Sequence, residues 1–417
     1  SHAHIDHSGR IPKLVNDGFQ GDIISTHATR SLCAIMLLDS AKIQERDAEY
    51  YNKRLIKKKK KKKNKKAKKQ KLRVPLYTVE DANDAMDQFT GAAYERWFRI
   101  SEDVEVFFRD AGHILGSASV TLRIKENGKT TTFGFTGDIG RPNRPILRDP
   151  LPMPEVDYLI CESTYGNKEH LTGPGESDRF LEIIKKTCIE KKGKLIIPAF
   201  SVGRTQEIVY MLDQMETKGL LPKIPVFVDS PLAVNATIIF GAHPECFDDN
   251  LSQYMLIDDN PFGFNELTYV RSVEVSKSLN QIKNGAIIIS SSGMMNAGRV
   301  RHHLANNIDN EKNTLLIVGY CSPDTPGGML RNGIDKIKLF GEWKPVKAEI
   351  EIMDSFSAHA DRKEILEFIK NQKAGMKKLF LVHGELDRQQ ALTEYLKEHG
   401  FDQDIEIPKL GESFDIS

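Results

Sequence analysis

The sequence predicts an α/β protein whose middle part forms a doubly wound parallel sheet. Apolar runs of the length of buried strands recur there, at residues 195–197, 226–228, 286–289 and 315–318. Helical patterns lie between them; Phe180, Ile183 and Ile184, for example, recur at helical spacing. Because strands alternate with helices, parallel βαβ units are expected. With 417 residues, the chain is long enough for two domains or one large one.

The parts on either side of this region also show α/β patterns. Before it, we expect a short helix at 11–18, a strand at 23–26, a helix at 29–55 and a linker with a helix at 74–90. Further strands are expected at 104–108, 120–124, 131–135, 156–161, 349–353 and 379–382. Asn127-Gly128 predicts a tight turn between two of them.

A lysine-rich run separates the predicted helix at 29–55 from the linker. Residues 57–71 hold twelve lysines and no acidic residue, while the whole chain has a formal net charge of +1, so the remainder is acidic. Like charges at this density resist packing, which predicts a flexible insertion. Two interpretations stay open: a phosphate-attracting arm, because each lysine can displace a counterion, and a solvated insertion without a function.

Cysteine usage and hydropathy indicate the compartment. The cysteines show no paired spacing, which is typical of free thiols in a reducing compartment: Cys33, Cys161, Cys188, Cys246 and Cys321. No apolar run of about eighteen residues and no signal peptide is visible. We expect a cytoplasmic protein without a membrane span. The chain opens inside a motif without an initiating Met, so we also expect it to be a fragment.

The chain begins with a dense group of metal-ligating residue types, in the sequence His2-Ala3-His4-Ile5-Asp6-His7. His2 and His4 are two residues apart, so on extended backbone they point the same way. Imidazole nitrogen and carboxylate oxygen are the ligands that ions such as zinc prefer. Four such donors within six residues would be hard to satisfy in an apolar core. The stretch therefore predicts a metal site.

This opening motif resembles the signature of the metallo-β-lactamase superfamily. The resemblance implies an αββα sandwich and a centre with two Zn²⁺, Mn²⁺ being the alternative. Carried over position by position, one ion would be held by His2, His4 and His113. The other would be held by Asp6, His7 and His383, and Asp138 would bridge the two. The three distant residues follow predicted strands, where α/β proteins place their sites.

Three further motifs resemble those of the β-CASP group within that superfamily. Glu162, in Glu-Ser-Thr-Tyr-Gly, matches the first; His359, in Phe-Ser-Ala-His-Ala-Asp, the second; and His383, in Val-His-Gly-Glu, the third. A histidine in the third motif is typical of RNA-directed members. The chain thus resembles the bacterial and archaeal relatives of the endonuclease that makes messenger-RNA 3′ ends, and more distantly RNase J, from residue 1 to about 410.

The resemblance implies three segments along the chain. Residues 1–166 would form the first part of the metallo-β-lactamase domain, including the flexible lysine-rich insertion at 57–71. Residues 167–346 would form the inserted β-CASP domain, and 347–417 the C-terminal part of the metallo-β-lactamase domain. The first strands of the sandwich are missing before Ser1, which agrees with a partial sequence.

The implied chemistry is hydrolysis of RNA phosphodiester bonds by metal-activated water. Asp6 would be a ligand and an acceptor of the water proton. His359 would protonate the leaving 3′ oxygen, and Glu162 would orient His359 through its other ring nitrogen. Structural alternatives stay open: Glu162 as a residue that caps a turn at a strand end, and His359 as a buried, hydrogen-bonded histidine.

The inserted domain is expected to hold the backbone of single-stranded RNA. The candidate contacts are Ser201, Arg204, Ser291, Ser292, Gly293 and Arg299. Hydroxyls and exposed backbone suit phosphate oxygens, and a helix beginning near Arg299 would add its dipole. A plain turn-and-cap role for the serines stays open. His302 and His303 are expected on the surface of that helix rather than among the ligands.

Two other functions are considered beside the ribonuclease. A catalytically silent RNA-binding scaffold is disfavoured because all seven ligand positions are filled. A metallohydrolase acting on a small ester or thioester is disfavoured because such a substrate needs no inserted domain over the site. The RNA target, internal or 5′-end attack, and the oligomeric state, with a homodimer as one option, stay open.

Overall fold

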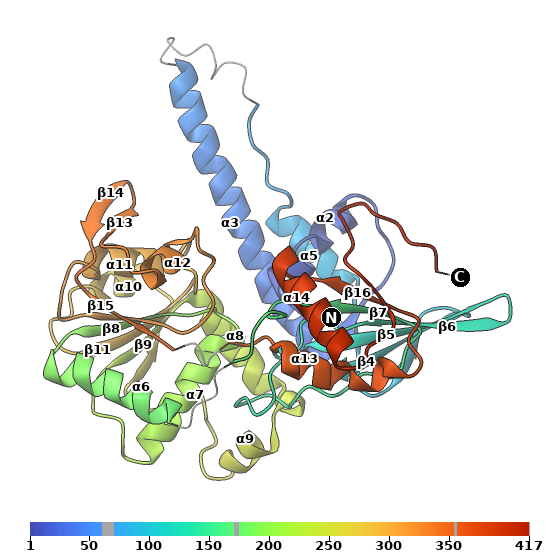
Figure 1. Cartoon of the computed structure of the whole chain (residues 1–417). Helices are drawn as coiled ribbons and strands as arrows, with labels where there is room; N and C mark the ends of the chain where they lie inside the picture. The colour runs from blue at the N-terminus through green and yellow to red at the C-terminus, as the bar shows by residue number, and fades with distance from the viewer. Residues whose placement is uncertain (61–70, 171–174, 354–356, 417) are drawn as a thin grey trace.

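The computed structural model describes residues 1–60, 71–170, 175–353 and 357–416 (Figure 1). It contains a seven-stranded sheet, a six-stranded sheet and two small two-stranded sheets, with helices packed against them. The predicted α/β class is therefore confirmed. In the described parts of the chain, no helix combines the length and the apolar character needed to cross a membrane. All five cysteines are free thiols and are buried.

The seven-stranded sheet has the strand order β17-β16-β7-β6-β5-β4-β3. Its strands are β3 (Trp97–Arg99), β4 (Val104–Asp110), β5 (Ala118–Glu126), β6 (Lys129–Phe135), β7 (Tyr158–Glu162), β16 (Lys378–Val382) and β17 (Asp404–Glu406). Strands β3 to β6 are antiparallel, and the pairs from β6 to β17 are parallel. The predicted turn joins β5 to β6, with positive φ at both Asn127 and Gly128, as a tight hairpin turn requires.

Two helices cover one face of this sheet at its C-terminal side. They are α13 (Arg362–Ile369) and α14 (Leu386–Glu398). Leu159 and Leu381 of the sheet pack with Ile365 of α13 and Leu392 of α14 in one buried cluster. Strands β7 and β16 lie side by side in parallel register although more than two hundred residues separate them. Their carboxyl ends therefore bring Glu162 and His383 to one edge of the sheet.

The N-terminal elements form a small layer beside this sheet. They are α1 (Ile5–Ser8), α2 (Ile11–Asn16), β1 (Ile23–Thr26), α3 (His27–Lys60), α5 (Val79–Asp87) and β2 (Phe89–Ala92). Strand β2, which pairs in parallel with β1, and strand β3 were not predicted. Strand β2 contains Gly91, which weakens a strand pattern, and β3 has only three residues. Helix α3 continues to Lys60, so the predicted flexible insertion begins within a helix. Residues 61–70 of that insertion lie outside the described residues.

The six-stranded sheet has the order β10-β9-β11-β8-β12-β15, and every pair in it is parallel. Its strands are β8 (Lys194–Pro198), β9 (Val226–Asp229), β10 (Leu267–Tyr269), β11 (Ala286–Ser290), β12 (Thr314–Ile317) and β15 (Glu349–Ile352). Neighbouring residues of β8 enter different cores, Ile196 on one face and Ile197 on the other. Helices therefore cover both faces, as the predicted doubly wound sheet requires.

The helices between these strands follow the predicted alternation. They are α6 (Glu176–Ile184) with a π-helical extension to Glu190, α7 (Arg204–Thr217), α8 (Pro231–Ala242), α9 (Asp249–Tyr254), α10 (Val273–Leu279), α11 (Val300–Asn307) and α12 (Pro326–Arg331). A hairpin of β13 (Lys336–Leu339) and β14 (Glu342–Pro345) projects from this part (Figure 1). Apolar residues of α3 and α8 share one core, including Leu37 and Ala236, so α3 lies between the two large sheets.

Strand β15 differs from the sequence prediction, which returned the chain to the first domain at residue 347. In the structure β15 pairs with β12 as the edge strand of the six-stranded sheet. An alternating pattern is typical of any half-exposed strand, and all four residues of β15 are partly exposed. The pattern therefore predicted a strand correctly but carried no information about which sheet it joins.

Loops from both large sheets meet where the chain crosses between them. Backbone bridges join Gly140 to His359 and Tyr165 to Asp361. A Cβ atom at Gly140 would lie 1.9 Å from the carbonyl oxygen of Gly112, so only glycine allows this approach. The Gly140 amide also donates to Ala111 O at 2.7 Å. The close approach keeps the loops that carry His113 and Asp138 together.

We expect Gly140→Ala to lower the free energy of unfolding by about 3 kcal/mol, because the added methyl group must displace backbone. Gly375→Ala is the matched control, since a Cβ there meets no atom within 4 Å. Urea unfolding of the two variants measures the difference. Equal stabilities would contradict the close approach.

Candidate metal centre and active site

The opening segment places its ligand-type residues by changing from extended backbone to a helix. His4 is extended, with φ −55° and ψ 144°, and α1 begins at the next residue. The hydroxyl of Ser8 donates to Ala3 O at 3.0 Å and to His4 O at 3.1 Å. These bonds fold the short helix back on the extended stretch. His2 and His4 therefore point to one place, while the side chains of Asp6 and His7 project from the helix toward a second place beside it.

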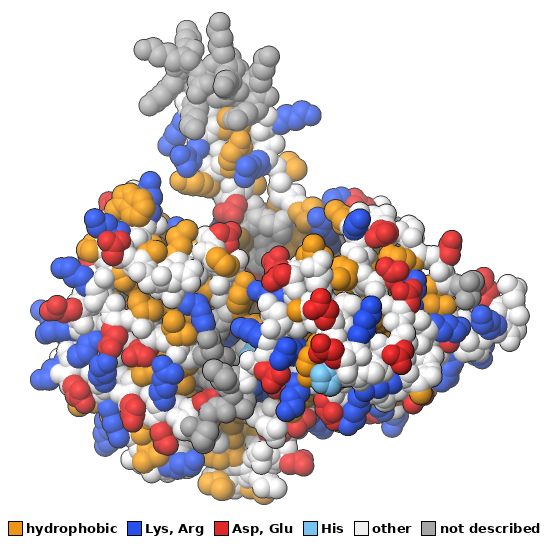
Figure 2. Space-filling model, viewed as in Figure 1, with side chains coloured by type: hydrophobic (Ala, Val, Ile, Leu, Met, Phe, Trp, Pro, Cys, Tyr) orange, Lys and Arg blue, Asp and Glu red, His pale blue; other side chains and the backbone are white. Residues whose placement is uncertain are grey.

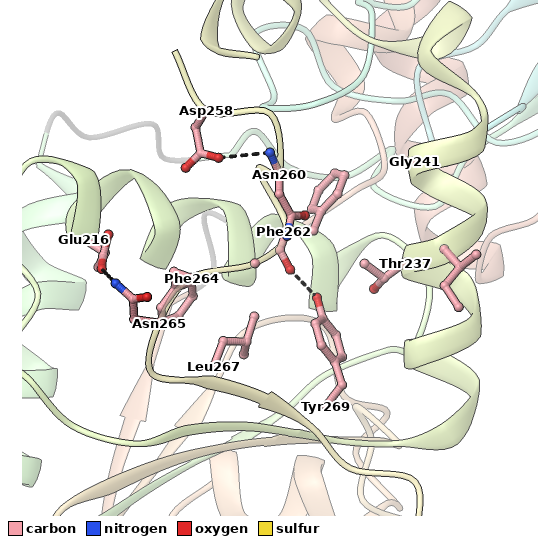
Figure 3. Close-up of a pocket in the computed structure, with 12 residues that line it drawn as sticks. Glu216, Thr237, Gly241, Asp258, Asn260, Phe262, Phe264, Asn265, Leu267 and Tyr269 are labelled. Atoms are coloured by element: carbon pink, nitrogen blue, oxygen red, sulfur yellow. Dashed lines mark hydrogen bonds between the residues drawn. The ribbon is translucent and has the colours of Figure 1, made fainter. Parts of the chain in front are cut away.

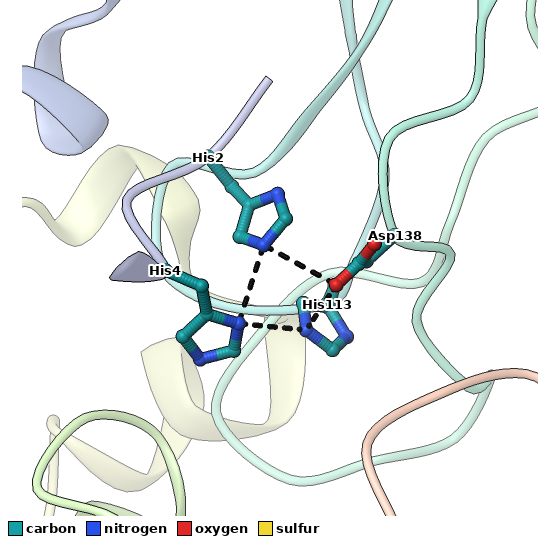
Figure 4. Close-up of side chains that lie close together, drawn as sticks. All are labelled: His2, His4, His113 and Asp138. Carbon is teal, nitrogen blue, oxygen red and sulfur yellow. Dashed lines mark hydrogen bonds and ion pairs between the residues drawn. The ribbon is translucent and has the colours of Figure 1, made fainter. Parts of the chain in front are cut away.

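The first group consists of His2, His4, His113 and Asp138 (Figure 4). His4 Nδ1 lies 3.2 Å from His2 Nε2 and 3.3 Å from His113 Nε2. Asp138 Oδ2 lies 3.3 Å from His2 Nε2 and 3.4 Å from His113 Nε2. Three imidazole nitrogens and one carboxylate oxygen thus converge from three separate segments of the chain.

These separations fit a tetrahedral zinc site. Bonds of about 2.0–2.1 Å in a tetrahedron place the ligand atoms about 3.3–3.4 Å apart, and four of the six distances between the ligand atoms of the first group are 3.2–3.4 Å. Hydrogen bonding alone cannot satisfy three imidazoles that all turn a nitrogen toward one point. Burial lowers the pKa of His4 to about 3 and that of His113 well below its usual value. Both rings are therefore neutral, the form that binds metal.

The second group consists of Asp6, His7 and His383. His383 Nε2 lies 3.5 Å from Asp6 Oδ2, and His7 Nε2 lies 3.8 Å from the same oxygen. The hydroxyl of Thr164 lies 2.9 Å from Nδ1 of His383, which turns the other ring nitrogen toward the group. The contact with Asp6 raises the pKa of His383 to about 9, so this ring has to lose a proton before it can bind metal. His383 also has a positive φ of 53° directly after β16, a strained conformation often found at functional sites.

Asp138 connects the two groups through its two carboxylate oxygens. Oδ2 faces the first group, while Oδ1 lies 3.3 Å from His7 Nε2 and 3.7 Å from His383 Nε2. Asp138 Oδ1 and His7 Nε2 are buried and have no hydrogen-bond partner among the described residues. Burial alone would raise the pKa of Asp138, but its contacts with His2 and His7 lower it well below the usual value. A buried carboxylate and unpartnered imidazoles of this kind fit bound cations.

His359 and Glu162 form a pair beside the first group. His359 Nδ1 lies 3.2 and 3.3 Å from the two oxygens of Glu162, while its Nε2 lies 4.0 Å from Asp138 Oδ2. Glu162 also accepts from the amides of Ile139 and Thr164. Burial alone would lower the pKa of His359, but Glu162 and Asp138 raise it above its ordinary value. The ring is therefore held with one nitrogen toward the metal groups.

His170 is a neighbour of this pair that the sequence analysis missed. Its Nε2 donates to the carbonyl oxygen of His359 at 3.0 Å, and its backbone amide donates to Asp361 at 2.8 Å. Asp361 also caps the start of α13. These bonds fix the backbone that carries His359. His170 lies in an irregular stretch with no motif around it, so no sequence signal pointed to it.

A cavity of about 420 Å³ opens over both groups. One wall contains His4, Asp6, His113, Asp138 and His359. The other comes from loops that follow the parallel strands of the six-stranded sheet: Phe200 and Val202 to Arg204 after β8, Met294 after β11 and Val318 to Tyr320 after β12. The carboxyl ends of parallel strands are the usual place for a binding site. The cavity thus combines metal-type ligands with a strand-end surface.

Arg204 is the predicted substrate contact that lines this cavity. It begins α7 and forms an ion pair with Glu207, which also receives a 3.0 Å hydrogen bond from Arg144. Both guanidinium groups therefore contact the carboxylate of Glu207 at this wall. Burial lowers the pKa of Arg204 to about 10, so the side chain stays charged at neutral pH.

The predicted serine contacts lie behind the cavity wall rather than in it. The hydroxyls of Ser201 and Ser291 both bond to the hydroxyl of Ser230, at 3.1 and 2.8 Å. Ser292 closes its own loop through Asn296 and the backbone of Ala297. Gly293 packs against the ring of Phe200, which lines the cavity. The plain turn-and-cap role that the sequence left open therefore describes these serines well.

Arg299 lies elsewhere than the sequence analysis expected. Its guanidinium donates to Asp229 Oδ1 at 2.6 Å and to the carbonyl oxygens of Val270 and Arg271. His303 is fully buried, with Nε2 2.7 Å from Asp229 Oδ2, so its expected position on a helix surface is wrong. Asp229 is fully buried and draws both side chains inward. An unpaired carboxylate at that depth would be strongly destabilising, which is why two basic groups turn inward.

A larger cavity, of about 730 Å³, lies between the end of α7, α8 and the loop before β10 (Figure 3). Its polar groups pair with one another: Asn265 donates to Glu216 at 3.2 Å, and Tyr269 donates to Phe262 O at 2.7 Å. No histidine or cysteine occurs among the described residues that line it. Size alone therefore does not identify the reactive site, and the chemistry belongs to the smaller cavity.

Comparison with known proteins agrees with this geometry. Residues 205–330 match the model of the Beta-Casp domain, and residues 343–408 match that of the Zn-dependent metallo-hydrolase RNA specificity domain. Ribonuclease TTHA0252 of Thermus thermophilus is 30% identical over 417 residues, which cover 100% of this chain and 87% of that protein. The transcription termination factors FttA of Methanosarcina mazei and Pyrococcus horikoshii are 30% identical over 92% of this chain.

The fold, the histidine and aspartate groups and these matches define a zinc-dependent metallo-hydrolase directed at RNA. The chain belongs to the β-CASP family of metallo-β-lactamase ribonucleases, as its motifs predicted. It spans 58% and 56% of the two archaeal factors, so those relatives contain long regions that this chain does not match.

Proposed function

We propose that this chain hydrolyses phosphodiester bonds in single-stranded RNA at a centre with two divalent ions. The observation that carries the proposal is the position of Asp138, whose two oxygens face two separate groups of ligand-type residues. One ion would be held by His2, His4 and His113, and the other by Asp6, His7 and His383. Asp138 would bind both ions. Imidazole and carboxylate donors favour Zn²⁺, with Mn²⁺ as the alternative.

Bound metals would supply a hydroxide near neutral pH and a positive clamp for phosphate oxygens. The chain's own residues would do the rest. Asp6 would accept the proton of the attacking water. His359 would hold a proton on Nε2, which faces the centre, and donate it to the leaving 3′ oxygen. Glu162, on Nδ1 of the same ring, would keep that nitrogen protonated and the ring oriented.

The cavity wall formed by the inserted domain would bind the RNA backbone. Arg204 lines the cavity and Arg144 lies beside it on Glu207, and guanidinium groups are well suited to phosphate oxygens. Of the predicted contacts, Arg204 is thus the direct one. Ser201, Ser291, Ser292 and Gly293 would shape the wall, and Arg299 would brace the loop they form through Asp229.

The finer architecture also belongs to this proposal. The seven-stranded sheet and the β1–β2 pair would be the two sheets of an αββα sandwich, the second represented here by two strands only. Five buried free thiols support a reducing compartment such as the cytoplasm. The enzyme would act in RNA processing or decay, as a monomer or as a homodimer.

The test is cleavage of an RNA labelled at either end, with Asp6→Ala as the control. We expect the wild-type protein to cut, the variant to cut at least about 10²-fold more slowly, and chelation to abolish cleavage by the wild type. Internal fragments would indicate endonuclease action, and a ladder from the 5′ end an exonuclease.

Two outcomes would sink the proposal. Binding of RNA without cleavage by a protein that contains two zinc ions would favour the catalytically silent scaffold. Hydrolysis of a small thioester, with RNA left intact, would favour the small-substrate hydrolase.

A further inference from the structure

We propose that the outer half of α3, together with the segment that returns beside it, is a second RNA-binding surface remote from the catalytic centre. We call it the basic arm and define it by residues 50–57 and 71–73. The proposal rests on the proposed function, because it concerns the RNA that occupies the active site. The occupant to which it commits is a single-stranded RNA long enough to reach both places.

The first observation is the direction of α3. Met36 of this helix lines the catalytic cavity, and the helix continues to Lys60. In Figure 1 it rises from between the two large sheets and projects beyond both. At a rise of about 1.5 Å per residue, the side chain of Lys57 lies about 30 Å along the axis from the cavity.

The second observation is that the helix and the returning segment of the basic arm are bound to each other. Asn52 donates to Arg73 O and accepts from Arg73 N, each at 2.8 Å. The guanidinium of Arg73 lies over the ring of Tyr51, 4.0 Å from its centre. The returning segment is therefore bound to the helix along its outer part, and the arm presents a defined surface.

The third observation is charge. The basic arm contains no acidic residue. It has five cationic residues at exposed positions: Lys53, Arg54, Lys57, Lys71 and Arg73. One of them, Lys53, pairs with Glu49 of the preceding turn at 3.1 Å, both side chains being exposed, and a pair of this kind is weak. Figure 2 shows Lys and Arg side chains, in blue, on the described part of the projection. The rest of the molecule is acidic, so the arm is a local site for polyanions.

The fourth observation favours nucleic acid over an acidic protein. Tyr50 is 63% exposed, and the guanidinium of Arg54 lies 5.5 Å from the centre of its ring. Tyr51 is partly exposed under Arg73. Flat aromatic and guanidinium groups interleaved with positive charge are the elements on which unpaired bases stack while phosphates pair with the cations. An acidic peptide would use the charges but would have no need of two tyrosines.

The geometry sets the RNA length above which the arm should contribute to binding. At about 3.4 Å per stacked nucleotide, 30 Å corresponds to roughly nine nucleotides. A six-nucleotide RNA would occupy the cavity alone, while a thirty-nucleotide RNA would reach both places. The arm would thus select long RNA by lowering its KM without changing the chemical step.

The test compares the K53E/R54E/K57E variant with wild-type enzyme on both RNAs. We expect the KM of the long RNA to rise about tenfold or more, with its kcat and both constants of the short RNA unchanged. The slope of log KM against log salt concentration should fall by about 0.7 for each phosphate that the variant no longer neutralises. Tyr50→Ala should raise the KM of the long RNA about fivefold or more by removing one stacking platform.

The matched control is K218E/K223E/K283E, which reverses three exposed lysines at the opposite, amino-terminal edge of the six-stranded sheet. It should leave the KM of both RNAs unchanged. Fluorescence anisotropy with the long RNA in EDTA provides a second measurement that does not depend on cleavage. It should show weaker binding for the arm variant only.

The outcomes separate the arm from the catalytic proposal. If wild-type enzyme cuts neither RNA, the proposed function fails, and anisotropy still tests the arm. If the arm variant binds and cuts the long RNA like wild type, the arm is not an RNA surface, and a protein partner takes its place. If both triple variants weaken binding equally, only general charge is involved, and the proposal is again overturned.

Discussion

Asp138→Ala is expected to lower kcat/KM for RNA cleavage by about 10³-fold or more and to remove bound zinc. Asp138 is 2% exposed and is the residue that gives one oxygen to each ligand group. Residues that only orient ligands cost about 10–100-fold when removed, so a ligand common to both groups should cost more. Zinc content by mass spectrometry, measured beside the cleavage rate, checks the expectation. Thermal unfolding should also become independent of added zinc.

Asp157→Ala is the control for this experiment. Asp157 accepts hydrogen bonds from the backbone and hydroxyl of Thr132 at 2.8 and 2.9 Å, but it precedes β7 at the end away from Glu162. Its removal should destabilise the sheet slightly and leave zinc content unchanged. If Asp138→Ala retained two zinc ions and wild-type cleavage, the shared carboxylate would have no role and the two-ion centre would be refuted.

His359→Ala is expected to lower kcat for RNA by about 10²–10⁴-fold while zinc content stays at the wild-type level. The reason is position: Nε2 lies 4.0 Å from Asp138 Oδ2, near the centre, while Nδ1 is engaged by Glu162. A proton donor matters only when the leaving group needs a proton. RNA with sulfur in place of the bridging 3′ oxygen should therefore be cut by the variant within about tenfold of the wild-type rate.

Glu162→Gln separates orientation from proton donation. The amide keeps the shape of the side chain but removes the charge beside Nδ1, so we expect about a 10–100-fold decrease in kcat.

If His359→Ala released zinc, the His359 side chain would be a ligand, as its grouping with Asp138 and His383 also allows. If His359→Ala lowered the cleavage rates of the sulfur-containing RNA and of the ordinary RNA equally, protonation of the leaving group would not be the role of His359.

The elements predicted best from sequence are those whose pattern depends on local burial. The apolar runs of the middle region became β8, β9, β11 and β12, because a strand covered on both faces must be apolar throughout. No strand was predicted at β2, which contains Gly91, or at β3, which has only three residues. The alternating residues of β15 predicted a strand but not its sheet, since pairing between distant segments leaves no trace in a local pattern.

Among the polar residues, too, the sequence predicted some positions and not others. Arg204, at the start of a helix, lines the cavity as predicted, whereas Arg299 and His303 are turned inward by Asp229. All three belong to the beginnings of helices that follow parallel strands, so their sequence contexts look alike. What differs is the buried carboxylate, which belongs to another strand. A side chain's partner across the sheet decides its direction, and sequence spacing does not report that partner.

By itself the sequence determined the family, the α/β class, the doubly wound insert and the identity of the ligand-type residues, because these depend on motifs and on local periodicity. Only the tertiary structure decided that His170 holds the backbone of His359, that Arg299 and His303 turn inward to Asp229, and that α3 extends far from the centre. Those facts depend mainly on contacts between segments that lie far apart in the sequence, as His170 and His359 do. Such contacts are set by the packing of whole sheets, which no single stretch of sequence contains.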